Sequence, residues 1–211
     1  MTTLGALKGE IADDLARDDL STQIASAITS AIFHYQQERF FFNETRTATF
    51  ATVSGQSRYS SSDDTDIPLF LEMDAFWLDD ASSQYELSVG DPEELDFLIG
   101  LDDGASGRPH SYARFGDGFI LYPEPDAVYT ARPMGHIEIA APASDSEANN
   151  PWMTKAYELI RCRAKAYLFL HVIKDANQAM GAGAGEGQAL SALRSKTNRK
   201  NATGHIRPTL F

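Results

Sequence analysis

The chain opens with two stretches in which apolar residues recur at helical spacing. In residues 3–17 the repeat consists of Leu4, Leu7, Ile11 and Leu15, with Thr3 available as the N-cap. In residues 21–40 the repeat consists of Ile24, Ile28, Ile32 and Tyr35. Because only the short segment RDDL separates the two stretches, they predict an antiparallel helical hairpin.

Between residues 45 and 140 the pattern changes to the alternation of apolar and polar residues that is typical of β-strands. Strands are predicted in residues 45–55, 67–78, 83–89, 110–125 and 127–140. The sequence Gly116-Asp117-Gly118 inside the fourth segment is a strong signal for a hairpin turn. A short helix is predicted in residues 90–100, because Asp91 can cap its first turn and Pro92 suits its first position.

The helical pattern returns after a polar connector at residues 141–150. One helix is predicted from Pro151 to about Lys174, and a final helix over residues 186–198. The segment GAGAGEG (181–187) is interpreted as a hinge or a loosened helical turn, since each glycine in a helix costs about 1 kcal/mol relative to alanine. The end of the chain shows no periodicity and is predicted to form a tail.

This order of elements predicts an α+β fold, in which N- and C-terminal helices form a bundle that carries an all-β insertion. The predicted parts are an N-terminal helical hairpin (1–44), a β-rich insertion (45–140), C-terminal helices that complete the bundle (151–200) and an extended tail (201–211). Hydrophobic residues make up 43% of the 211 residues, which is enough for a buried core.

Charge is spread unevenly along the chain, whose formal net charge is −12. Residues 1–150 hold 8 Lys and Arg against 27 Asp and Glu, whereas residues 151–211 hold 10 against 3. An acidic surface argues against duplex binding over the body of the protein, because phosphate affinity depends on lysine and arginine. It favours a surface that DNA can pass without sticking, or one that only keeps the protein soluble.

The cysteine content and the length of the apolar runs indicate in which cellular compartment the protein is made. Cys162 is the only cysteine, so an intrachain disulfide and a cysteine metal cluster are excluded, as expected of a protein made in a reducing cytoplasm. The first residues lack the basic and apolar regions of a signal peptide, and the most apolar run (166–173) is too short for a membrane span. No membrane association is expected.

The candidates for chemistry are weak. The segments SSDDTDIP (61–68) and LDDAS (78–82) bring carboxylates together, but both are more typical of solvated turns than of a catalytic pair. The histidines do not have metal-ligand spacing, and His171 is interpreted as a core or interface residue. Arginines on both sides of Cys162 could lower its thiol pKa, but a nucleophile would need a partner that the sequence does not reveal. We therefore predict no catalytic site, no metal site and no cofactor.

Five segments together resemble the head-to-tail connector proteins of tailed bacteriophages, particularly short-tailed ones, which are also called adaptors or tail accessory factors. They are LKGEIADDLARDDLSTQIASAITSAIFHYQQERFFFNE (7–44), TFATVSGQSRY (49–59), GRPHSYARFGDGFILYPEPDAVYTAR (107–132), WMTKAYELIRCRAKAYLFLHVIKD (152–175) and ALSALRSKTNRKNATGHIRP (189–208). The resemblance covers nearly the whole chain in the family's order, and it departs from the family at residues 59–68 and 181–187.

The resemblance implies a structural, non-enzymatic virion protein at the portal–tail junction, assembled in the host cytoplasm. About twelve copies would form a dodecameric ring under the portal, bind downstream tail or nozzle proteins, and extend the channel through which genomic DNA passes without specific binding. The helices would form the ring body, and the β part would face the tail or neighbouring subunits.

Two groups of residues are the predicted contact sites within this role. The subunit-interface candidates lie in the most apolar helix and are Tyr167, Phe169, Leu170 and His171. The portal-binding candidates lie in the tail and are His205, Ile206, Arg207, Pro208, Leu210 and Phe211. The apolar tail residues would act as anchors, and the guanidinium of Arg207 would bind a carboxylate. A frayed, solubilising end is the alternative interpretation of the tail.

Two other functions remain open from the sequence. The first is a peptidoglycan-cleaving virion enzyme that uses paired acids such as Asp79 and Asp80, although adjacent residues on a strand point apart. The second is a nucleic-acid binder that uses the basic segment 194–207, whose affinity would fall steeply with salt.

Overall fold

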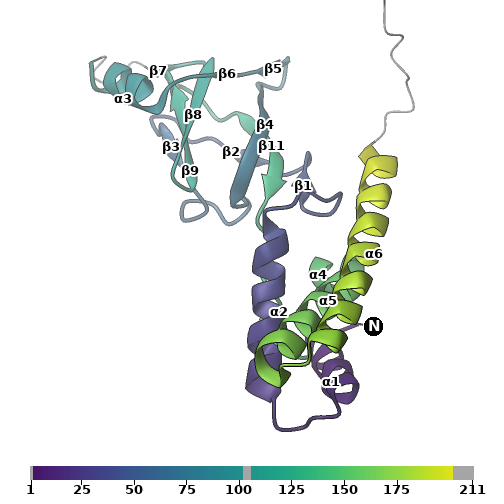
Figure 1. The fold of residues 1–211 in the computed structure, drawn as a ribbon. Helices are drawn as coiled ribbons and strands as arrows, with labels where there is room; N and C mark the ends of the chain where they lie inside the picture. The colour runs from purple at the N-terminus through teal and green to yellow at the C-terminus, as the bar shows by residue number, and fades with distance from the viewer. Residues whose placement is uncertain (1, 102–105, 202–211) are drawn as a thin grey trace, which may run out of the picture. The chain divides into compact units, whose positions relative to one another are not determined.

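The computed structural model describes residues 2–101 and 106–201. It contains helices together with mainly antiparallel sheets, which confirms the predicted α+β class. The chain divides into two compact units (Figure 1): a helical unit, Met1–Phe42 with Ile139–Phe211, and a β unit, Asn43–Glu138.

The helical unit is built from five α-helices and one π-helical turn among the described residues. They are α1 (Leu4–Leu15), α2 (Ser21–Gln36), α4 (Pro151–Lys155), α5 (Tyr157–Leu168), η1 (Phe169–Ile173) and α6 (Ala176–Asn201). As predicted, the hydroxyl of Thr3 caps α1 by accepting a hydrogen bond from the backbone N–H of Ala6 at 3.2 Å. Helix α5 contacts α1, α2 and α6, so it is the central helix of this unit.

The core of the helical unit is centred on Trp152, which is fully buried. The ring of Phe42 packs edge-on against it with ring centroids 5.2 Å apart, and Phe40 stacks on Phe42 at 5.5 Å. The indole N–H of Trp152 donates to the backbone carbonyl of Ile139 at 3.0 Å, so burying this side chain leaves no unpaired donor. The aromatic residues that follow α2 are thereby joined to the second half of the chain.

The interpretation of GAGAGEG as a hinge is wrong, because α6 runs unbroken through residues 181–187. Packing explains why glycine is tolerated there. A Cβ atom on Gly185 would lie 3.1 Å from the Cys162 sulfur on α5, so glycine allows the two helices to approach closely. Asp175 also starts the helix early by accepting hydrogen bonds from the backbone N–H groups of Asn177 and Gln178, both at 3.0 Å.

This packing predicts opposite effects for two glycines of the same helix. Gly183→Ala should raise the free energy of unfolding by about 1 kcal/mol, since its Cβ would meet nothing within 4 Å and alanine is the better helix former. Gly185→Val should lower it by about 2 kcal/mol, because the larger side chain forces α6 away from Cys162. Urea unfolding followed by circular dichroism measures both, and equal effects of the same sign would contradict the packing explanation.

The single helix predicted from Pro151 to Lys174 is interrupted twice. Ala156 leaves helical geometry (φ −122°, ψ 17°) and separates α4 from α5. Beyond α5 the chain widens into the π-helix η1, which ends where Lys174 adopts the left-handed conformation and the N–H of Asp175 donates to the carbonyl of Phe169. These breaks change which side chains of this segment face the core.

The β unit contains two main sheets. The first is β1 (Glu44–Thr45) and β2 (Phe50–Ala51) on β11 (Thr130–Ile137), followed by β4 (Phe70–Asp79) and β5 (Gln84–Glu86). The second has the order β3 (Arg58–Tyr59), β9 (Gly118–Tyr122), β8 (Ser111–Phe115) and β6 (Ser88–Val89). The remaining elements are α3 (Pro92–Leu101) and the parallel pair β7 (Ser106–Gly107) and β10 (Glu124–Pro125).

The predicted hairpin at Gly116 is confirmed, because β8 and β9 pair antiparallel around a two-residue loop and Gly116 has a φ of +60°. The predicted strand at 45–55 is wrong in extent. Only two short pieces of it, β1 and β2, pair with β11, and the hydroxyl of Thr45 accepts backbone hydrogen bonds that turn the chain between them. The β core is aromatic and includes Phe50, Phe76 and Phe119.

Candidate interaction surface

The acidic pair Asp79 and Asp80 is organised as a turn. The carboxylate of Asp80 accepts hydrogen bonds from the hydroxyl of Ser82 at 2.7 Å and from the backbone N–H of Ser83, also at 2.7 Å. These bonds, with Arg108 3.0 Å away, lower the pKa of Asp80 to about 2. A general acid for glycoside cleavage needs a raised pKa, so Asp80 does not have the electrostatics of that role.

Titration of the carboxyl carbons by NMR tests this assignment. Asp80 should remain ionised until about pH 2, because its hydrogen bonds stabilise the charged form. The variant Ser82→Ala removes the first of those bonds and should shift the pKa of Asp80 upward. A pKa above the ordinary value in the unmodified chain would reopen the catalytic interpretation.

The other chemical candidates also have structural roles. Asp63 caps its turn by accepting from the N–H and hydroxyl of Ser60, at 2.8 and 2.7 Å. Among residues 2–101 and 106–201, His, Cys, Asp and Glu side chains form no group of three or more that could hold a metal ion. The thiol pKa is not lowered overall, because burial and Glu158 raise the pKa of Cys162 to about 11 and outweigh the lowering effect of Lys165 and Arg161. Cys162 is therefore a packing residue of α5.

An exposed apolar surface of the helical unit lies at the junction of α5, η1 and α6. Tyr167 and Leu170 are exposed, at 45% and 53%, and the imidazole of His171 lies beside the Tyr167 ring with centroids 4.6 Å apart. Together with Arg163, Ala166 and Ala179 they line a groove of about 210 Å³. We refer to Tyr167, Leu170 and His171 as the α5–η1 face.

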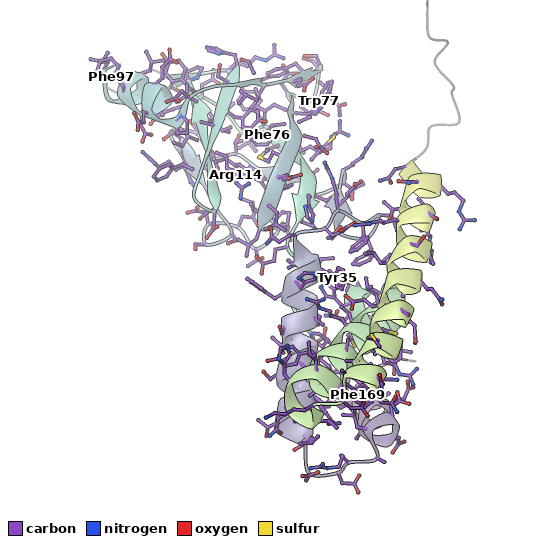
Figure 2. All side chains as sticks on the ribbon, in the orientation of Figure 1. Tyr35, Phe76, Trp77, Phe97, Arg114 and Phe169 are labelled. Carbon is purple, nitrogen blue, oxygen red and sulfur yellow. The ribbon has the colours of Figure 1, made fainter. Side chains whose placement is uncertain are left out.

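The structure separates the four predicted interface residues. Phe169 is buried in the core of the helical unit (Figure 2), whereas the other three form the α5–η1 face. Of the two interpretations of His171, a core or an interface residue, the core position is wrong because its side chain is exposed, and the interface position stays a prediction. The π-helical turn accounts for this division, since Leu168 and Phe169 point inward in succession and the next two residues point outward.

A network of hydrogen bonds that the sequence did not reveal joins α6 to α2 and to α5, which carries part of the α5–η1 face. Glu186 on α6 accepts a hydrogen bond from the hydroxyl of Tyr35 at 2.5 Å and from Arg163 at 3.2 Å, so it links α2, α5 and α6. Burial and the Glu186 carboxylate raise the pKa of Tyr35 above its usual value. The sequence carried no signal for this network, because Tyr35 and Glu186 are 151 positions apart and meet only through the packing of the helices.

The basic end of the chain is partly committed to internal contacts. Arg194 forms two hydrogen bonds with the carboxylate of Glu38, at 2.5 and 2.9 Å. The ammonium groups of Lys196 and Lys200 lie over the ring of Phe41, 5.2 and 4.1 Å from its centroid. These contacts leave a smaller basic surface for nucleic acid than the sequence suggested. The predicted portal-binding residues, His205 to Phe211, lie outside the described residues.

Among the described residues, the candidate acids Asp63 and Asp80 cap turns and Cys162 is buried, whereas Tyr167 and Leu170 form an exposed apolar face on the helical unit. An exposed apolar face of this kind is a candidate contact surface for another protein. None of the helices in the described part of the chain is long and apolar enough to cross a membrane.

The chain matches the SU10 adaptor protein family over residues 2–209 and belongs to this family of phage adaptor proteins. No curated protein matches the chain. Membership confirms the predicted class, a structural bacteriophage protein. It implies a virion component at the head–tail junction that associates with portal and tail proteins.

Proposed function

We propose that the chain is the head-to-tail adaptor of a short-tailed phage, assembled in the host cytoplasm as a ring of about twelve copies under the portal. The observation that carries this proposal is the family match, which spans residues 2–209. In the proposed ring the N- and C-terminal helices form a bundle that makes the ring body. The β unit is an insertion in that bundle and contacts tail or nozzle proteins.

The charges of the two units support this division of roles. Within residues 43–138, 5 Lys and Arg face 19 Asp and Glu, a net charge of −14, whereas the helical unit is close to neutral with 13 against 11. An acidic wall repels the phosphate backbone, so genomic DNA can pass the ring without specific binding.

The α5–η1 face is the proposed contact between neighbouring copies in the ring. Its two large side chains are solvent-exposed, and the network of Tyr35, Arg163 and Glu186 holds the helices that present it. An exposed apolar face on a fixed scaffold associates without paying for reorganisation of the backbone.

The end of the chain is the proposed contact with the portal. Each tail would insert between portal subunits, with Ile206, Leu210 and Phe211 as apolar anchors and Arg207 binding a carboxylate. Repetition of this contact around a ring gives high avidity from modest individual contacts.

Deletion of residues 203–211 tests the portal contact. We expect the shortened chain to keep its melting temperature, since α6 ends at Asn201, and to lose at least about a hundredfold of its affinity for portal rings through lost avidity. Replacing the same segment by a glycine–serine sequence of equal length is the matched control for length alone. Undiminished portal affinity of the shortened chain would overturn the proposed role of the tail.

A further inference from the structure

Helix α3 presents an apolar and acidic face to solvent. Its inward side chain Leu95 packs against Ala113 and Ile120 of the β8–β9 hairpin. Phe97 and Leu101, one turn apart on the opposite side, are 65% and 62% exposed, and Figure 2 shows Phe97 on the outside of the helix. At 100° per residue, Glu93 and Glu94 fall on this same outer side. We call these four residues the α3 face.

The helical unit contains a groove of complementary character between α5 and α6. Leu159, Leu193 and Ala189 contribute apolar lining, and Lys155 and Lys196 are exposed lysines on its margin. The groove measures about 300 Å³. A cavity of about 150 Å³ accommodates benzene, so this groove has room for a phenyl ring together with a second apolar side chain.

The charges around this groove favour an acidic occupant. Among the described residues no ion pair is shown for Lys155 or Lys196, and the contact of Lys196 with the Phe41 ring leaves its positive charge without a carboxylate partner. Glu158 also lines the groove, but Arg161 lies 3.4 Å from its carboxylate. Two lysines and one glutamate give the lining of the groove a net positive charge.

We propose that the α3 face of one copy docks into the α5–α6 groove of a second copy. The apolar pair Phe97 and Leu101 would enter between the leucines, and the carboxylates of Glu93 and Glu94 would approach the two lysines. This is the helix-in-groove mode of recognition, with apolar anchors spaced by one turn. The inference rests on the proposed function, because it assigns a second contact within the same ring.

Charge reversal in the full-length chain tests the pairing. Glu93→Lys with Glu94→Lys, and separately Lys155→Glu with Lys196→Glu, should each weaken self-association at least about tenfold in sedimentation velocity. A chain carrying all four changes should associate to within about threefold of the unmodified chain, because the complementarity is restored. All four side chains are exposed, so the melting temperature reports whether each variant is folded.

Cross-linking tests whether the contact joins different copies. A chain with Leu101→Cys is mixed with one carrying Ala192→Cys, at an exposed position of the groove, and oxidised. The mixture should form disulfide-linked dimers, while Val128→Cys, at another exposed position of the β unit, should give none with the same partner. The buried thiol of Cys162 has a raised pKa and contributes little background.

The outcomes distinguish this inference from the function on which it rests. Four changes that fail to restore association, or cross-linking equal to that of the Val128→Cys control, would overturn the α3 docking. Rings that form and bind portal normally despite either charge reversal would overturn it too, and would leave the adaptor role intact. Failure of the unmodified chain to associate with itself or with portal would overturn both.

Discussion

Gly135→Ala is expected to lower the free energy of unfolding of the β unit by about 3 kcal/mol. Gly135 lies on β11 where the register with β4 shifts between Met134 and Gly135. A Cβ atom built there would lie 2.1 Å from the carbonyl oxygen of Glu72 and 2.9 Å from the Cα of Met73. Both contacts are with backbone, so the two central strands of the sheet would have to separate.

Urea unfolding followed by circular dichroism measures this effect. Gly100→Ala is the matched control within the same unit, because its Cβ would meet nothing within 4 Å and alanine favours helix, so stability should rise by up to about 1 kcal/mol. A loss of stability for Gly135→Ala no larger than that of an ordinary surface change, about 0.5 kcal/mol, would contradict the described pairing of β4 and β11.

Tyr167→Asp combined with Leu170→Asp is expected to weaken ring assembly by at least about a hundredfold, the effect of losing a central apolar contact. Both side chains are largely exposed in the single copy, so the melting temperature should stay close to that of the unmodified chain. Burying two carboxylates in an interface without partners carries a large desolvation cost. Native mass spectrometry and sedimentation velocity would report the change in assembly.

Two further variants make this result specific. Phe169→Ala should instead lower stability by about 3 kcal/mol, because Phe169 lies in the helical core and not on the α5–η1 face. Val128→Asp places a carboxylate at an exposed apolar position of the β unit and should leave assembly unchanged if the effect is confined to the α5–η1 face. Normal assembly of the Tyr167, Leu170 double variant would remove this face from the ring contacts.

Elements whose signal is local were predictable from the sequence. The periodic leucines and isoleucines of residues 4–15 and the cap at Thr3 specify α1 with few alternatives. The hairpin at Gly116 follows from a turn that needs a positive φ, which glycine supplies without steric cost. In both cases the residues that determine the structure are neighbours in the chain.

Elements that depend on distant contacts were not predictable. Helix propensity suggested a break at residues 181–187, but α6 is continuous and approaches α5 so closely that a Cβ on Gly185 would lie 3.1 Å from the Cys162 sulfur. Likewise, β1 and β2 exist only where β11 pairs with them, so alternation alone overstated their length. Tertiary packing decided both cases.

The candidate site was predicted only in part, because tertiary packing also decides which of its side chains are exposed. An apolar run in a helix identified the segment that contains Tyr167 and Leu170, but the π-helical turn that directs Phe169 inward has no signature in the sequence pattern. The link from Glu186 to Tyr35 spans 151 positions and is set by the packing of three helices. The acidic clusters were interpreted correctly as turns, because aspartates that accept hydrogen bonds from neighbouring backbone N–H groups favour turns and this signal is local.

Native mass spectrometry of portal rings mixed with this protein tests the adaptor role most directly. We expect the rings to gain about twelve copies, because an adaptor of the portal should match its symmetry. The same mixture with residues 203–211 deleted should lose most of the bound copies. Portal rings that gain no mass at any ratio of the two proteins would contradict the proposed function.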